Sequence, residues 1–260
     1  MNPIMIDLGF ATITWYAFLM ISGFCIAILI AIKELKHTNI LKDVFLDYVF
    51  YVVLFGLLGA RIWYVLFDSS TYINDPMQIF AIWNGGLAIH GGITAGIIVT
   101  YFYSKKRSIN PFLLTDIAIP GLLIGQSLGR FGNFINQEAH GGATTYEFLK
   151  DTLHLPEFIV NGMYIDGVYY HPTFLYESIW NLIGFIIVIF ILRPKFRFNI
   201  GMLTAFYLMW YGFIRTFIEA MRTDALMFGV IKVAQLTSIA MFIVGVCLMI
   251  YFNKTRRKND

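Results

Sequence analysis

The stretch FLLTDIAIPGLLIGQSLGRFGNFINQE, residues 112–138, begins as an apolar segment and ends in a polar run. Residues 112–134 are long enough to cross the ~30 Å hydrocarbon core of a bilayer as a helix. The polar run from residue 129 to residue 138 contains Arg130, Asn133, Asn136 and Glu138. Removing such charged groups from water costs several kcal/mol unless they are paired. We therefore expect a membrane protein that holds a polar ligand at residues 129–138.

The composition extends this expectation to the whole chain. Of its 260 residues, 58% are hydrophobic and only 13% are charged, and the mean hydropathy is +0.69. These values are typical of a polytopic membrane protein. The apolar runs predict an all-α fold with seven transmembrane helices in a single membrane domain covering residues 1–260. The predicted helices are 13–32, 45–67, 87–103, 112–134, 173–192, 202–221 and 234–252.

The distribution of basic residues predicts the orientation of these helices. Lysines and arginines cluster after the first, third, fifth and seventh predicted spans: Lys33, Lys36, Lys42, Lys105, Lys106, Arg107, Arg193, Lys195, Arg197, Lys254, Arg256, Arg257 and Lys258. Cytoplasmic loops carry such an excess, so we expect the N-terminus outside and the C-terminus in the cytoplasm. The net charge of +3 then reflects topology, and no nucleic-acid partner is expected.

The longest connection, residues 139–172, lies between the fourth and fifth predicted spans. A structureless loop of this length is uncommon, so we expect a small external cap. Asn161-Gly162 is the residue pair that type I′ hairpin turns favour, and it is flanked by the apolar segments 158–160 and 163–165. The pair predicts a β-hairpin within the cap. Before the third span, residues 76–83 have interfacial aromatic character and are expected on the outer surface.

Polar residues occur in or beside six of the seven predicted spans, always toward the outer end. They are Tyr16; Arg61; His90; Arg130, Asn133, Asn136 and Glu138; His171, Tyr176 and Glu177; and Tyr211, Arg215, Glu219 and Arg222. In the sixth span, spacings of four, four and three place Tyr211, Arg215, Glu219 and Arg222 on one helical face. We expect these groups to meet in a common chamber near the outer leaflet.

His90 lies between Gly85-Gly86 and Gly91-Gly92, so that backbone or a ligand could approach the imidazole closely. Cys25 and Cys247 lie in apolar spans and are expected to act as small hydrophobic residues. The chain has no CxxC or HExxH spacing, so neither a metal ion nor another cofactor is expected. Asp116 is expected to be an interfacial charge without a chemical role.

Five segments share motifs with a known family. The run GRFGNFINQE, continued to Gly142, resembles the signature of the bacterial phosphatidylglycerol–prolipoprotein diacylglyceryl transferase family. GARIWYV at Arg61, GGLAIHGG at His90, HPTFLYE at residues 171–177 and YGFIRTFIEAMR at residues 211–222 are similar to further family blocks, in the family's order. Together these segments cover the second to the sixth predicted span.

The resemblance implies a reaction and a location. The family transfers the diacylglyceryl group from phosphatidylglycerol to the thiol of the lipobox cysteine in a prolipoprotein, and glycerol 1-phosphate is released. Phosphatidylglycerol, prolipoprotein signal peptides and the lipid bilayer are the expected partners, in the cytoplasmic (inner) membrane of a bacterium. Because the thiol belongs to the substrate, the absence of a credible nucleophilic Cys or Ser in the chain fits this reaction.

Within this interpretation we expect Arg130 and Arg215 to stabilise the phosphate, since guanidinium groups make bidentate contacts. His90 is the expected general base, because histidine side chains titrate near neutral pH. The expected substrate-binding residues are Tyr16, Arg61, Asn133, Asn136, Glu138, Tyr211, Glu219 and Arg222.

Several of these assignments have structural alternatives. Asn133, Asn136 and Glu138 could orient Arg130, and Arg215 could pair with Glu219. His90 could simply bond a nearby carbonyl, and Arg61 could reach toward lipid headgroups. The Tyr176–Glu177 pair could clamp the fourth helix or help to select headgroups, and a structural role is expected.

Two other functions compete with the transferase reading. A transporter of an anionic lipid or solute could also use an arginine-lined cavity, but carriers usually hold their substrate near the midplane with access from both sides. A seven-helix receptor would not need two arginines at the outer end.

Overall fold

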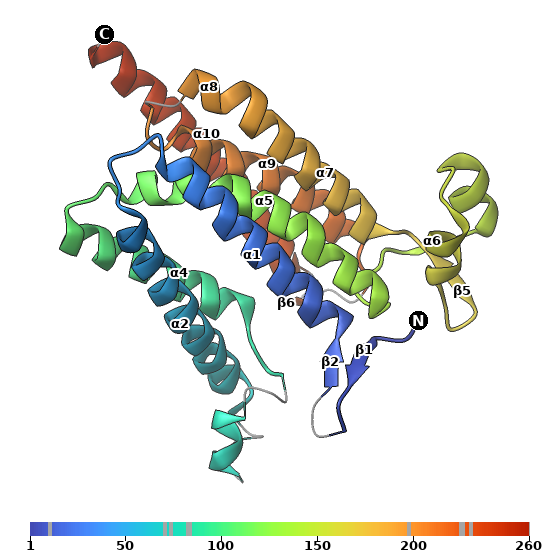
Figure 1. Ribbon diagram of the computed structural model, residues 1–260. Coiled ribbons are helices and arrows are strands. Elements are labelled where there is room, and N and C mark those ends of the chain that lie inside the picture. Colours follow the sequence, from blue (N-terminus) through green and yellow to red (C-terminus); the bar gives the residue numbers. More distant parts are fainter. Residues whose placement is uncertain are drawn as a thin grey trace. The chain divides into compact units, whose positions relative to one another are not determined.

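The computed structural model describes residues 1–9, 12–69, 72, 75–81, 85–196, 199–223, 227–228 and 231–259. They form two compact units: unit 1 comprises Met1–Glu34 and Thr115–Asp260, and unit 2 comprises Leu35–Leu114. Figure 1 labels their elements.

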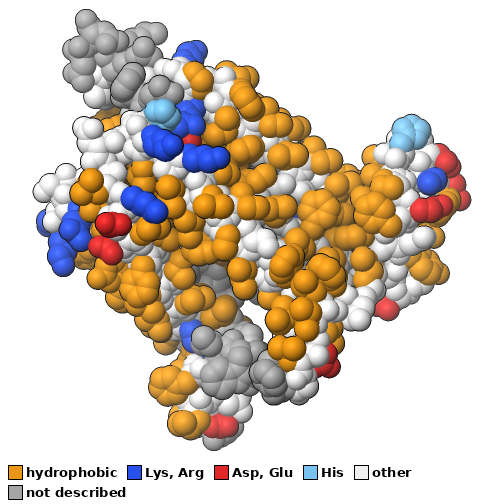
Figure 2. All heavy atoms as spheres, in the orientation of Figure 1, with side chains coloured by type: hydrophobic (Ala, Val, Ile, Leu, Met, Phe, Trp, Pro, Cys, Tyr) orange, Lys and Arg blue, Asp and Glu red, His pale blue; other side chains and the backbone are white. Residues whose placement is uncertain are grey.

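The fold is mostly helical, and a helix is present at each of the seven predicted places. These are α1 (Trp15–Leu35), α2 (Lys42–Phe67), α4 (Ile89–Arg107), α5 (Pro111–Ile135), α7 (Thr173–Ile187), α9 (Met202–Met221) and α10 (Val233–Asn259). The π-helical turn η4 (Val188–Leu192) and α8 (Arg193–Phe196) extend α7. Five of the described helices, those starting at Trp15, Lys42, Pro111, Thr173 and Val233, are long and apolar enough to cross a membrane. The chain is therefore a multi-pass membrane protein, and hydrophobic side chains cover most of the helical surface in Figure 2.

Glycines bring α1 and α5 of unit 1 into close contact. A Cβ atom on Gly121 would lie 2.6 Å from the carbonyl oxygen of Ala27, and one on Gly125 would lie 3.5 Å from that of Gly23. A Cβ on Gly132 would lie 2.6 Å from the ring of Tyr16. Small residues spaced in this way allow membrane helices to approach backbone to backbone.

Polar contacts fix α5, α7 and α9 against one another. Trp180 and Trp210 stack at 4.2 Å, and the indole N–H of each donates to the backbone carbonyl of the other, at 3.0 Å and 3.1 Å. The hydroxyls of Ser127 and Ser178 lie 2.8 Å apart between α5 and α7.

Asp116 has a structural role that its position in the sequence does not indicate. Its carboxylate accepts hydrogen bonds from the backbone N–H of Gly201 at 2.6 Å and that of Thr204 at 2.8 Å, and from the Thr204 hydroxyl at 2.6 Å. The first N–H groups of a helix have no partner within it. Asp116 of α5 therefore caps the N-terminus of α9.

Unit 2 pairs α2 with α4 and includes the 3-10 helix η1 (Pro76–Phe80). Trp83 of the predicted interfacial segment lies outside the described residues. A Cβ on Gly91 would collide with the carbonyl oxygen of Gly59, and one on Gly92 would lie 3.4 Å from that of Gly56. Gly91 and Gly92 therefore allow α4 to pack closely on the backbone of α2.

Residues 143–170 fold as a small subdomain, which we call the cap. It contains β3 (Ala143–Thr144), the π-helical turn η3 (Phe148–Thr152), α6 (Glu157–Gly162), β4 (Tyr164–Ile165) and β5 (Val168–Tyr170). Its antiparallel sheet has the order β3-β5-β4. Charged side chains gather at the end of the cap in Figure 2.

The predicted hairpin turn at Asn161-Gly162 is wrong. These residues end α6, and the hairpin of β4 and β5 turns at Asp166-Gly167, where both residues have positive φ (49° and 87°). Asp-Gly satisfies the same type I′ requirement as Asn-Gly. Pro156 and Glu157 provide the start of α6, because Pro fits a helix start and an acidic residue fits its first turn.

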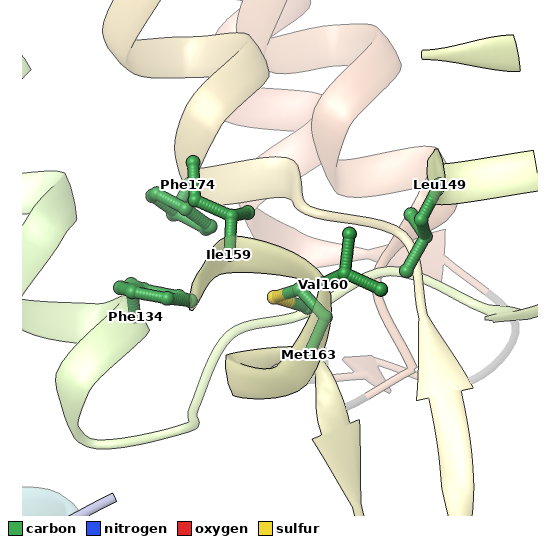
Figure 3. Close-up of a cluster of buried hydrophobic side chains, with 6 residues drawn as sticks. All are labelled: Phe134, Leu149, Ile159, Val160, Met163 and Phe174. Carbon is green, nitrogen blue, oxygen red and sulfur yellow. The ribbon is translucent and has the colours of Figure 1, made fainter. Parts of the chain in front are cut away.

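A cluster of buried side chains joins the cap to α5 and α7 (Figure 3). Phe134 of α5 and Phe174 of α7 stack with ring centroids 4.4 Å apart. The cap adds Leu149, Ile159, Val160 and Met163 to this cluster. The cap is thus packed directly on the end of α5 that carries the polar run.

Two short hairpins complete unit 1. They are β1 (Ile4–Asp7) with β2 (Thr12–Thr14), before α1, and β6 (Met227–Phe228) with β7 (Ile231–Lys232), between α9 and α10.

Candidate active site

A buried carboxylate joins two arginines at the centre of unit 1. Glu177 of α7 has a side chain only 1% exposed, and its Oε1 lies 2.6 Å from Nη2 of Arg130 on α5. Its Oε2 lies 3.0 Å from Nη1 of Arg215 on α9. One carboxylate of α7 thus fixes a guanidinium group of α5 and one of α9. The Trp180–Trp210 and Ser127–Ser178 contacts hold these helices against α7.

The network continues along α9. Nη2 of Arg215 lies 2.7 Å from Oε2 of Glu219, and Nη1 of Arg222 lies 3.7 Å from the same oxygen. These pairs confirm that the residues share one helical face, as their spacing predicted, and that Arg215 pairs with Glu219.

A chain of amides extends from Arg130. Its Nη1 donates to Oδ1 of Asn133 at 3.3 Å, and Nδ2 of Asn133 donates to Oε1 of Glu138 at 2.8 Å. Nδ2 of Asn136 donates to the same oxygen at 3.3 Å. The three residues that the sequence assigned to headgroup binding are therefore also linked to Arg130.

The end of α5 aims Glu138 back toward the helix. Gln137 has a positive φ of 55°, and the backbone N–H of Glu138 donates to the carbonyl of Asn133 at 3.0 Å. This is the hydrogen bond of a Schellman helix end. It turns the chain so that Glu138 meets Asn133 and Asn136.

Two tyrosines border the network. Tyr211 lies near enough to Arg130 for the two side chains to interact electrostatically, and its ring stacks on that of Tyr207 with the centroids 5.7 Å apart. Tyr16 of α1 packs against Gly132, which lies two residues after Arg130. Both tyrosines thus lie next to the polar run of α5.

The network can bind an anion. Three guanidinium groups, those of Arg130, Arg215 and Arg222, face the two carboxylates of Glu177 and Glu219. A small hollow beside them is lined by Arg130, Asn133, Glu177 and Arg215, among others. Pre-oriented guanidinium groups that are largely shielded from water, as these three are, are suited to stabilise charge on a phosphate.

His90 and Arg61 belong to unit 2. His90 is the second residue of α4 and is half-buried. Among the described residues of this unit, no hydrogen bond to its imidazole is found. Arg61 is 6% exposed, and its guanidinium donates to backbone carbonyls of residues 78–86. The alternative in which Arg61 reaches toward lipid headgroups is therefore wrong.

Unit 1 thus brings together most of the predicted site residues: Tyr16, Arg130, Asn133, Asn136, Glu138, Tyr211, Arg215, Glu219 and Arg222. Two residues contribute more than the sequence indicated. Glu177, for which a structural role was expected, contacts Arg130 of α5 and also Arg215 of α9. Lys232 was not considered, and its Nζ donates to the carbonyls of Glu219, Ala220 and Arg222 at 3.0, 3.0 and 2.6 Å. Nothing in its local sequence indicates this cap of α9.

Within the described residues, no group of three or more His, Cys, Asp or Glu side chains is arranged to hold a metal ion.

Residues 3–251 match the family model described as prolipoprotein diacylglyceryl transferase. Curated relatives named phosphatidylglycerol–prolipoprotein diacylglyceryl transferase are similar over nearly the whole chain. The protein of Lactobacillus acidophilus is 48% identical over 97% of this chain and 90% of its own length. That of Staphylococcus saprophyticus is 44% identical, over 96% and 88%, and that of Streptococcus agalactiae is 45% identical, over 96% and 95%.

Proposed function

We propose a mechanism for this chain from the premise that it belongs to the prolipoprotein diacylglyceryl transferase family. It is an enzyme that transfers the diacylglyceryl group of phosphatidylglycerol to prolipoproteins. The observation that carries the mechanism is the ion network in which Glu177 holds Arg130 and Arg215, at 2.6 Å and 3.0 Å.

The bond changes define what the site must supply. The thiol of the lipobox cysteine attacks the carbon of the diacylglyceryl group that bears the phosphate, so a C–S bond forms and the bond between that carbon and the phosphate oxygen breaks. Glycerol 1-phosphate leaves with the electron pair, and the thiol proton passes to a base. Arg130 and Arg215 stabilise the phosphate oxygen on which charge develops.

Glu177 and Glu219 serve this step by orientation. A carboxylate that binds two guanidinium groups fixes their planes before the substrate arrives, so little reorganisation is needed during the reaction. Arg222, which lies 3.7 Å from Glu219, adds positive charge at the edge of the network. Tyr211 and Tyr16 complete the pocket around the phosphate.

The headgroup glycerol is bound by Asn133, Asn136 and Glu138. Both amides donate to Oε1 of Glu138, so its Oε2 is available to accept a glycerol hydroxyl. A site built to bond hydroxyls discriminates strongly against a headgroup that lacks them.

His90 is the general base that takes the thiol proton. Its imidazole has no hydrogen-bond partner among the described residues of unit 2, which leaves a ring nitrogen available as acceptor. Histidine suits this task because its side chain changes protonation near neutral pH.

The membrane arrangement follows from charge and hydropathy. The chain forms one membrane domain with seven spans, α4 and α9 being added to the five long apolar helices. It lies in the bacterial cytoplasmic membrane with the N-terminus outside and the C-terminus in the cytoplasm. The cap and the ion network are then at the outer side.

The test is lipid transfer by purified protein from radiolabelled phosphatidylglycerol to a lipobox peptide. Arg130→Lys, Arg215→Lys and His90→Gln should each lower transfer by about 100-fold or more, because one oriented charge or base accounts for 10²–10⁴-fold in rate. A peptide with Ser in place of Cys should accept no label. Wild-type rates in the Lys variants would refute the phosphate role, and full activity of His90→Gln across pH would refute the base.

A further inference from the structure

The guanidinium of Arg61 is occupied by the chain that leads into α4. Its Nε donates to the carbonyl of Ile79 at 2.9 Å, and its Nη2 to that of Gln78 at 2.5 Å. Its Nη1 donates to the carbonyls of Gly85 and Gly86, at 2.8 Å and 2.9 Å. Four of the five guanidinium N–H groups therefore bind backbone on both sides of this connection.

Neighbouring contacts hold the same segment. The backbone N–H of Ala88 donates at 3.0 Å to the carbonyl of Ala60, the residue before Arg61. A Cβ on Gly86 would lie 2.5 Å from Nη1 of Arg61, so the segment lies directly on the guanidinium. Residues 85–88 are thus attached to α2, and His90 follows two residues later.

We propose that Arg61 is a positioning residue that sets the location of the His90 imidazole by fixing the chain before α4. This inference rests on the proposed role of His90 as the base. It replaces direct substrate binding by Arg61, because a side chain 6% exposed with four donors bound to protein carbonyls has little left to offer a lipid.

Lysine cannot replace arginine here. An ammonium group is a single point with three donors, whereas the guanidinium reaches carbonyls on two segments in a planar fork. Arg61→Lys keeps the positive charge but loses the fork. It therefore separates a role of charge from a role of geometry.

The first measurement is hydrogen exchange of the purified protein in lipid nanodiscs. Arg61→Lys should speed exchange at residues 85–94 and leave residues 42–58 of α2 unchanged. Gly86→Ala, which displaces the guanidinium from the other side, should give the same pattern. The control is Arg107→Lys, whose arginine is 44% exposed with one ion pair to Asp47 at 3.2 Å. Unchanged exchange at residues 85–94 in Arg61→Lys would overturn the proposal.

The second measurement is the kinetics of transfer to the lipobox peptide. A misplaced base lowers kcat, so Arg61→Lys should reduce kcat by about 10- to 100-fold with little change in KM for phosphatidylglycerol. Arg107→Lys should match the wild type. A rise in KM with an unchanged kcat would indicate direct lipid binding and overturn the positioning role.

A double variant links Arg61 to His90. If Arg61 acts through the imidazole, Arg61→Lys should cost little further activity when added to His90→Gln. Losses that multiply would overturn the inference while leaving the base role intact. Full activity of His90→Gln alone would instead refute the proposed base and with it the positioning role, whereas hydrogen exchange would still report whether Arg61 holds the segment.

Discussion

Glu177 is the residue on which the ion network depends, because its two oxygens bind arginines from two other helices. Replacing it with Gln removes one buried negative charge: Arg215 keeps Glu219 as a partner, whereas Arg130 loses the carboxylate that it contacts at 2.6 Å. Removing one partner of a buried ion pair destabilises a protein by about 3–5 kcal/mol. We therefore expect Glu177→Gln to lower both the thermal midpoint and the rate of transfer, by about 100-fold or more for the rate.

Thermal unfolding in detergent and the peptide assay check this expectation. The matched control is Glu157→Gln on the cap, where the carboxylate is 56% exposed and lies 3.7 Å from Lys150. Exposed pairs of this kind contribute about 0–1 kcal/mol, so this variant should behave like the wild type. Equal behaviour of the two variants would contradict the central role of Glu177.

Much of the site can be predicted from the sequence at the level of single residues. Arg215, Glu219 and Arg222 share a helical face by spacing alone, and the amide of Asn133, three residues after Arg130, lies beside it by the same rule. The pairing of Glu177 with Arg215, 38 residues apart, could not be predicted because no local period links α7 to α9. Lys232 was missed for the same reason, since a cap formed from another element leaves no mark on the helix that it caps.

Helix contacts determine how the network is held. The α1–α5 contact relies on residues without side chains, and a Cβ on Gly121 would lie 2.6 Å from the Ala27 carbonyl and 2.7 Å from its Cα. Gly121→Val should therefore push α1 away from α5 and lower the thermal midpoint and transfer together, since overpacking costs about 1–3 kcal/mol. The control is Gly96→Ala, whose new Cβ would meet its nearest neighbour at 4.0 Å. A normal midpoint in Gly121→Val would contradict the close contact.

Asp116 determines where α9 begins. Its carboxylate accepts three hydrogen bonds from the first turn of α9, and losing a helix cap costs about 0.5–2 kcal/mol. Asp116→Ala should lower stability by about this amount and reduce transfer, because Arg215 and Glu219 lie on the same helix. Asp116→Asn keeps an acceptor oxygen, so its stability in chemical denaturation should lie between that of the wild type and that of Asp116→Ala. An Asp116→Ala variant as stable as the wild type would contradict the cap.

Elements were easier to predict than turns. The sixth predicted helix matches α9 at both ends, Met202 and Met221, because apolar runs bounded by Gly and Arg define it clearly. The first helix starts at Trp15 because residues 12–14 form β2, and hydropathy cannot separate a short apolar strand from a helix start. In the cap, Asn161-Gly162 and Asp166-Gly167 both have the chemistry of a type I′ turn. The apolar residues 158–160 belong to α6, so the hairpin turns at Asp166-Gly167.

For the whole molecule, the prediction is the side of the membrane on which each end lies. A peptide tag after Asp260 should be cut by protease only when the cytoplasmic side is open. A cysteine introduced at Glu157 of the cap, with Cys25 and Cys247 replaced by Ala, should react with a membrane-impermeant maleimide in intact cells. The physical reason for this orientation is the excess of lysine and arginine after alternate spans, which is retained on the cytoplasmic side. Labelling of the cap only after cell lysis would contradict this orientation.

The reciprocal indole bonds of Trp180 and Trp210 lock the register of α7 against α9. Sliding one helix by a single residue, about 1.5 Å along its axis, would break both bonds at once. Bilayers that differ in thickness impose tilt and strain on membrane helices, and two helices joined in this way respond as one body. Glu177 and Arg215 lie about one helical turn from these indoles. We therefore expect the distance between them, and with it the electrostatic potential of the ion network, to stay constant as lipid composition varies.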